Sequence, residues 1–184
     1  DRDVTGVQTC ALPICSMKKV ALVIAERQFR DEEYQVPHAI LEKAGFDVLT
    51  VSTSTKTAVG KLGLKVTPDT LISDLKPEEL DALVFIGGGG SEQYFADPLA
   101  HRLATTMVSL DKVLGAICIA PVILANAKVL EGKKATVFPD GAPILKQNGA
   151  NYTGREVEVD GKIITGNGPE AAEAFGHALV KLLS

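Results

Sequence analysis

One short apolar run, residues 113–117, constrains the fold of this chain more than any other segment. Its sequence, Val-Leu-Gly-Ala-Ile, is typical of a strand buried on both faces of a parallel sheet. Pro121 follows closely and opens a second apolar stretch at 122–127. Proline is well tolerated in the first turn of a helix, where its missing N–H group is not needed. The run therefore predicts a sharp strand-to-helix turn around Cys118.

Cys118 stands at this predicted turn between two small residues, Ala116 and Ala120. A nucleophile elbow of this kind exposes one side chain, and small neighbours let the backbone pack closely. The first turn of the following helix would favour a thiolate, because its unpaired amides and dipole stabilise negative charge. A buried, inert cysteine is the alternative for any cysteine in an apolar run. The turn favours the functional interpretation, so we expect Cys118 to be a nucleophile with a lowered pKa.

Strand and helix patterns alternate along residues 17–184, which we interpret as a single domain. Strands are expected at 20–25, 46–51, 82–86, 113–117 and 135–138, and helices at 31–44, 98–110, 122–127, 141–148 and 169–183. A small hairpin is expected within 53–67, and the Asp160-Gly161 turn predicts another between 157–159 and 162–165. Repeated βα units predict an α/β sandwich with a mainly parallel sheet.

The first 16 residues are excluded from this prediction as a non-native leader. They resemble translated sequencing-adapter read-through, and their apolar piece, interrupted by Pro13, is too short for a secretory signal. Cys10 and Cys15 lie in this leader. Without them Cys118 has no disulfide partner, which leads us to expect a reducing, cytoplasmic setting.

Composition excludes several classes of partner and cofactor. The net charge is −4 without a basic block, so nucleic acid is not expected, and no apolar run is long enough for a membrane span. The three histidines, His38, His101 and His177, are far from Cys118 in sequence, and no cluster has metal-ligand spacing. We therefore expect no metal and no bound cofactor.

Two further segments carry candidate site residues. The glycine run 87–90 follows a predicted buried strand, so the N–H of Gly88 could hold an oxyanion together with that of Ile119. A flexible turn is the alternative, and the run does not match a dinucleotide fingerprint. Glu33 shares the apolar face of its predicted helix with Pro37 and Ile40, and a carboxyl group facing a core needs a partner or a proton. A solvated surface glutamate is the alternative there.

Taken together, these motifs resemble those of the DJ-1/PfpI superfamily, within the class I glutamine amidotransferase-like proteins. The matching segments are 29–37, 77–88, 115–121, 132–139 and 160–169, in the order in which the family has them. The resemblance implies a flavodoxin-like three-layer sandwich that forms homodimers or larger homo-oligomers. It also implies Cys118 as the nucleophile, Glu33 as a protonated carboxyl group against it, and an amide pocket formed by Gly88 and Ile119.

Two departures from the family pattern bear on activity. Peptidase-type members carry histidine directly after the cysteine, where this chain has Ile119, and DJ-1-type members carry a histidine where this chain has Phe138. An intracellular peptidase is therefore the less favoured reading. The activity that the resemblance implies is a weak glyoxalase III or deglycase activity on small 2-oxoaldehydes, carried by Cys118 and Glu33. The alternatives are a redox-sensing stress protein with an oxidisable Cys118 and a catalytically silent protein.

Overall fold

The computed structural model describes residues 16–184, so the predicted leader, with Cys10 and Cys15, lies almost entirely outside the described part of the chain. A seven-stranded sheet runs through the molecule in the order β10-β11-β7-β6-β1-β2-β5. Its main strands are β1 (Lys19–Val23), β2 (Asp47–Ser52), β6 (Ala82–Phe85), β7 (Val113–Ile117) and β11 (Ile163–Gly166). These five strands are parallel, and their order is that of a flavodoxin-like sheet.

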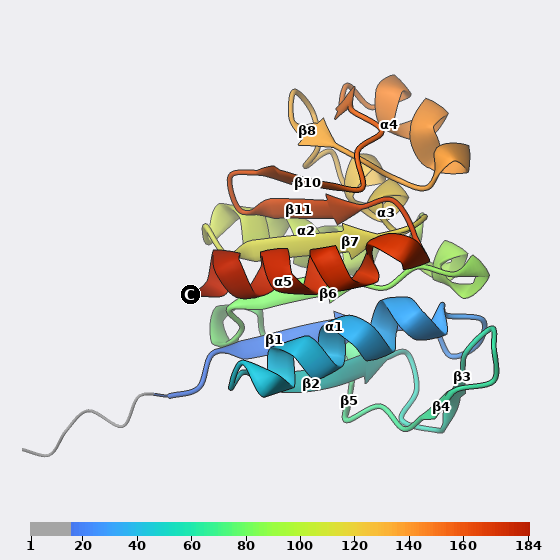
Figure 1. Cartoon of the computed structure of the whole chain (residues 1–184), viewed down its shortest axis with the longest axis vertical. Coiled ribbons are helices and arrows are strands. Elements are labelled where there is room, and N and C mark those ends of the chain that lie inside the picture. The colour runs from blue at the N-terminus through green and yellow to red at the C-terminus, as the bar shows by residue number, and fades with distance from the viewer. Residues whose placement is uncertain (1–15) are drawn as a thin grey trace, which may run out of the picture.

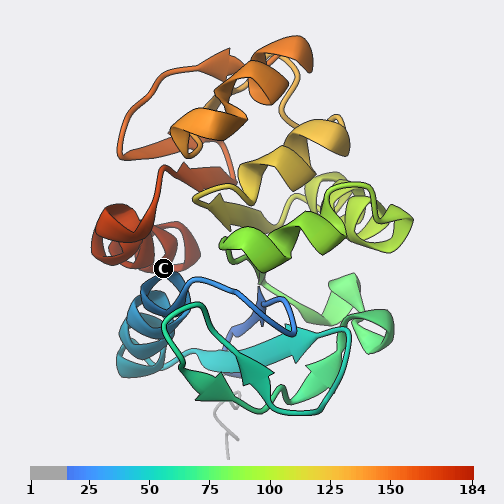
Figure 2. The same cartoon turned by 90° about the vertical axis from the view of Figure 1, so that its right-hand side faces the viewer.

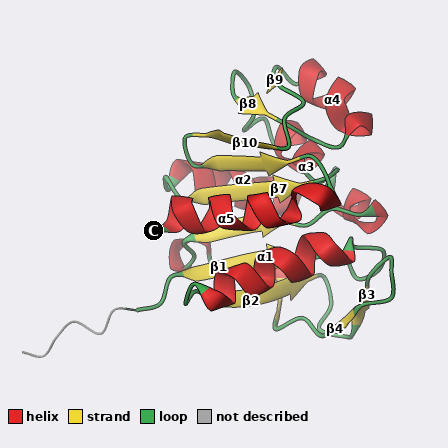
Figure 3. Cartoon of the chain, viewed as in Figure 1, coloured by secondary structure: helices red, strands yellow, loops and turns green. Residues whose placement is uncertain are grey.

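Helices cover both faces of the sheet (Figures 1 and 2). On one face lie α1 (Asp31–Lys43) and α5 (Ala172–Leu183), and on the other α2 (Pro98–Ser109), α3 (Pro121–Asn126) and α4 (Ala142–Gln147). Figure 3 shows the same layers by type of element. Alternating side chains of β1 enter the two cores, so that Val20 and Leu22 pack on the side of α1 and α5, and Ala21 and Val23 on the other side. The predicted three-layer α/β sandwich is confirmed.

Both predicted hairpins form, although the first is small. β3 (Ala58–Val59) pairs with β4 (Lys65–Val66) in an antiparallel hairpin. β10 (Val157–Asp160) pairs antiparallel with β11 across the predicted Asp160-Gly161 turn. The sequence pattern did not predict two short strands, β5 (Thr70–Leu71) and β9 (Asn151–Tyr152). Each has two residues, too few to show a period.

The strand predicted at 135–138 is wrong in length. The observed β8 (Lys134–Ala135) pairs only with β9, outside the main sheet. After it, the Thr136 N–H donates to Thr165 Oγ1 at 2.9 Å, and the Phe138 N–H donates to the Cys118 carbonyl at 2.6 Å. These bonds turn residues 136–138 away from a strand ladder and toward the predicted elbow.

Short 3-10 helices complete the connections. They are η1 (Ile72–Asp74), η2 (Pro77–Glu79), η3 (Gly89–Tyr94), η4 (Pro139–Gly141) and η5 (Pro169–Ala171). The glycine run 87–90 follows the end of β6, and its last two residues begin η3. No helix of residues 16–184 has the length and apolarity needed to cross a membrane.

Candidate active site

The predicted elbow forms between β7 and α3, with Cys118 at its apex. Cys118 has φ of +64°, a left-handed conformation that is unusual for a residue with a side chain. Its N–H donates to the Gly166 carbonyl at 2.9 Å, and its own carbonyl accepts from the Phe138 N–H. Residues held in this region cost about 1–3 kcal/mol and are concentrated at functional sites. Cys118 is a free cysteine and is only 9% exposed.

Glu33 lies against the elbow from the first turn of α1. Its carboxyl group is fully buried, at 0% exposure, and neither oxygen has a partner at full hydrogen-bonding geometry among the described residues. A Cβ atom placed on Gly87 would lie 2.6 Å from Glu33 Oε2 and 2.6 Å from Cys118 Cβ. The carboxyl group and the cysteine therefore converge on the space beside Gly87 that a side chain would occupy, and any side chain at position 87 would displace them.

Backbone packing explains why α1 begins at this place. The Arg30 N–H donates to the Gly87 carbonyl at 3.0 Å, just before the helix starts. Gly88 has φ of +97°, and a Cβ there would lie 2.3 Å from the Gln28 carbonyl oxygen and 2.5 Å from the Arg30 nitrogen. Only glycine permits this close approach. The glycine run thus joins the segment before α1 to the end of β6, and this brings Glu33 to Cys118.

The pKa values of the two groups are shifted in the same direction. Burial raises the pKa of Glu33 to about 7, although the Cys118 thiol, the charge of Arg30 and the Gly87 peptide each lower it. Burial is also the main cause that raises the pKa of Cys118 to about 12, with the nearby Glu33 as the second. The expectation of a lowered thiol pKa is therefore wrong at rest, since desolvation and the carboxyl group outweigh the helix terminus.

The amides of Gly88 and Ile119 both act on the sulfur. Their N–H groups lower the pKa of Cys118, as hydrogen bonds to a thiolate do. The structure thus brings the four predicted site residues together, from α1, the glycine run and the elbow. Two further residues were missed by sequence reasoning, Gly87 and Arg30. The sequence could have indicated both residues, because each lies next to a candidate site motif.

The histidines lie elsewhere. His38 packs its ring against Tyr34 with centroids 5.2 Å apart, His101 bonds the Phe95 carbonyl at 2.9 Å, and His177 lies 4.0 Å from Glu173. Position 138 beside the elbow carries a phenyl ring, 39% exposed. Within residues 16–184 no group of three or more His, Cys, Asp or Glu side chains is arranged to hold a metal ion.

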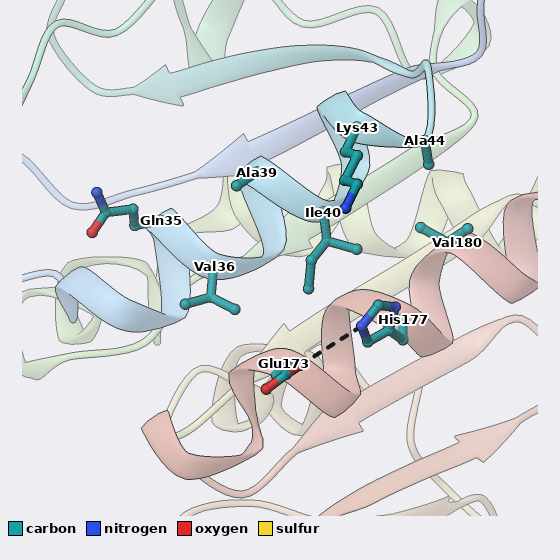
Figure 4. Close-up of a pocket in the computed structure, with 9 residues that line it drawn as sticks. All are labelled: Gln35, Val36, Ala39, Ile40, Lys43, Ala44, Glu173, His177 and Val180. Carbon is teal, nitrogen blue, oxygen red and sulfur yellow. Dashed lines mark ion pairs between the residues drawn. The ribbon is translucent and has the colours of Figure 1, made fainter.

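A groove lies apart from the elbow, between α1 and α5 (Figure 4). Its volume is about 570 Å³, and its lining includes Val36, Ile40, Glu173, His177 and Val180. None of the four predicted site residues lines it. Cavity volume by itself therefore does not identify the candidate active site. The elbow is the better candidate because the nucleophile, the carboxyl group and the amides converge there.

The chain is similar in sequence to several known proteins. The chain is 42% identical over 168 residues to an uncharacterized protein of Methanocaldococcus jannaschii, with 90% of this chain and 82% of that protein covered. It is 35% identical to the putative cysteine protease YraA of Bacillus subtilis (90% and 98% covered) and 33% identical to a protein of Pyrococcus abyssi named as a deglycase (88% and 98% covered).

A solved structure gives the same result for the fold. The ThiJ/PfpI domain protein of Brachyspira murdochii superposes with a TM-score of 0.88 at 34% identity, covering 91% of this chain and 96% of that one. The model of the DJ-1/PfpI family matches residues 18–182. That range includes the elbow, the glycine run and the first turn of α1. This chain therefore belongs to the DJ-1/PfpI family.

Proposed function

We propose that this protein is a cysteine-dependent enzyme of the glyoxalase III or deglycase type, which slowly converts small 2-oxoaldehydes to 2-hydroxy acids. One observation carries the proposal: a buried carboxyl group, Glu33, lies against Cys118 on a strained elbow, where two amides face the sulfur. The deglycase name of the Pyrococcus abyssi relative supports this reaction class.

The first step forms a bond between sulfur and carbon. Above pH 7 the Glu33 carboxylate accepts the thiol proton as the sulfur adds to the aldehyde carbon of the substrate. The electron pair of the C=O bond moves to oxygen, which lies against the N–H groups of Gly88 and Ile119 and then takes up the proton. The product is a hemithioacetal, and Glu33 is again a carboxylate.

The next steps move one proton between the two substrate carbons. The Glu33 carboxylate removes the proton from the former aldehyde carbon and returns it to the neighbouring ketone carbon through an enediol, while the hydroxyl proton of the hemithioacetal passes to the former ketone oxygen. The aldehyde carbon is oxidised to a thioester while the ketone carbon is reduced to an alcohol, so no outside oxidant is needed. Water then attacks the thioester, the C–S bond breaks, and a 2-hydroxy acid and the free thiol are released.

Slow turnover is expected because the raised pKa keeps the Cys118 thiol protonated at neutral pH and no imidazole adjoins it. A well-placed acid–base group contributes about 10²–10⁴-fold to rate. The test compares wild type, Cys118→Ala and Glu33→Gln for lactate formed from methylglyoxal, measured stereospecifically. Loss of aldehyde is not a sufficient readout, since thiols bind aldehydes reversibly. Lactate formation that persists unchanged in Cys118→Ala would contradict the mechanism.

A redox-sensing role is the second candidate, and one observation favours it. The amides of Gly88 and Ile119 and a protonated Glu33 would stabilise a sulfinate on Cys118 without any substrate pocket. Sulfinate formation under mild peroxide without lactate production from methylglyoxal would support this role over the enzyme. If neither occurs, the protein is catalytically silent. The peptidase name of the Bacillus subtilis relative is less well supported here, because Ile119 follows the cysteine.

A further inference from the structure

A hollow of about 290 Å³ lies beside the elbow. It is lined by six residues, Phe138, Pro139, Asn167, Gly168, Pro169 and Glu170. We refer to it as the Phe138 hollow. The sequence analysis noted position 138 only as the place of an absent histidine, and the mechanism above does not use the phenyl ring.

Both walls of the Phe138 hollow are bonded to the main chain of the nucleophile. One wall begins at Phe138, whose N–H donates to the Cys118 carbonyl at 2.6 Å. The other follows Gly166, whose carbonyl accepts the Cys118 N–H at 2.9 Å and which directly precedes Asn167. The hollow therefore adjoins the main chain of Cys118 on both its N–H side and its carbonyl side.

Two prolines and a phenyl ring give the hollow flat, stiff faces beside the polar side chains of Asn167 and Glu170. Pro139 and Pro169 occupy the first turns of η4 and η5, where their rings restrict the backbone. The Phe138 ring lies over Gly168, since a Cβ on that glycine would meet Phe138 Cδ2 at 3.7 Å. The ring remains 39% exposed. A ligand with a flat apolar part would cover it.

Resting on the proposed function, we propose that the Phe138 hollow binds the substituent on the ketone carbon and selects 2-oxoaldehydes that carry an aryl group. A cavity of about 150 Å³ is enough to hold benzene, so a phenyl group fits here with room to spare. The methyl group of methylglyoxal would leave most of the hollow unfilled. The acidic side chain of Glu170 at the rim disfavours an anionic substituent.

The test compares two substrates in four proteins. Mandelate formed from phenylglyoxal and lactate formed from methylglyoxal give a ratio of kcat/KM values for wild type, Phe138→Ala, Phe138→Tyr and Leu110→Ala. We expect wild type to prefer phenylglyoxal and Phe138→Ala to lower the ratio about tenfold or more, whereas Phe138→Tyr keeps it. Leu110 is a matched control, 41% exposed at the end of α2. A ratio unchanged in Phe138→Ala would overturn the proposal.

A second readout separates this proposal from the glyoxalase reaction. Phenyl vinyl sulfone and methyl vinyl sulfone alkylate thiols by addition, in which the C–S bond forms at one vinyl carbon and a proton adds to the other. The rates are measured at Cys118 by peptide mass and expressed as a phenyl-to-methyl ratio. If no hydroxy acid forms but Phe138→Ala lowers this ratio, the Phe138 hollow stands and the proposed function fails. If hydroxy acids form and Phe138→Ala alters neither ratio, only the hollow is refuted.

Discussion

Replacing Glu33 with glutamine should make the protein more stable at alkaline pH, although it removes a proposed catalytic group. Burial raises the pKa of this carboxyl group from its ordinary value of 4.5 to about 7. Between these two values the folded state holds a proton that the unfolded state releases, so the free energy of unfolding falls as pH rises. The cost is absent below pH 4.5 and complete above about 7. Glutamine does not titrate and does not incur it.

The size of the effect follows from the displacement of the pKa. The difference between 4.5 and about 7 corresponds to roughly 3.4 kcal/mol when fully expressed, of which about 2.5 kcal/mol falls between pH 5 and pH 8. The stability difference between Glu33→Gln and wild type should therefore grow by about 2.5 kcal/mol over this interval. With a typical urea slope this is a change of roughly 1 M in midpoint.

The assay is urea unfolding followed by circular dichroism at pH 5 and pH 8, with reductant present. Titrations elsewhere in the protein occur in both variants and cancel in the difference. Glu92→Gln is the control, because Glu92 is exposed on η3 and its carboxyl group remains hydrated. A pH-independent difference between Glu33→Gln and wild type would refute the reasoning, because it would mean that the carboxyl group does not titrate near neutral pH in the folded protein.

Four further outcomes are expected. The rate at which iodoacetamide alkylates Cys118 should rise as pH increases through about 7, because Glu33 loses its proton there and can accept the thiol proton. The Glu33→Gln variant should lack this rise in rate, and a rise that persists would exclude Glu33 as its source. Phe138→His should raise lactate formation tenfold or more by adding an imidazole beside the elbow, and an unchanged rate would count against a missing base. Gly87→Ala should destabilise the protein by about 1–3 kcal/mol and make Cys118 less reactive, because the new Cβ would lie 2.6 Å from atoms of both Glu33 and Cys118. Calorimetry measures the loss of stability as a lower melting temperature. Light scattering should show a homodimer or larger assembly, and a monomer at all concentrations would contradict that prediction.

Much of this molecule can be predicted from sequence because its signals are local. The elbow is an example: a short β-rich run, a small-residue turn and a proline at the start of a helix are all contiguous. The Asp160-Gly161 hairpin is specified by two residues in the same way. Short strands such as β5 and β9 escape prediction, because two residues carry no period and their pairing depends on neighbours from elsewhere in the chain.

The structure brings the predicted site residues together, but it contradicts the predicted pKa of the thiol. The sequence by itself determined that Cys118 is at a turn and that Glu33 is on an apolar helix face. Only the tertiary structure decided that the glycine run brings these two groups to the same space beside Gly87. It also showed that the pKa of the thiol is raised, not lowered as expected. Desolvation depends on everything packed around the sulfur, whereas the favourable effect of a helix terminus can be predicted from a few adjacent residues. The Phe138 hollow likewise depends on a hydrogen bond between residues 20 positions apart and on a strand end still further along the chain, which no local pattern specifies.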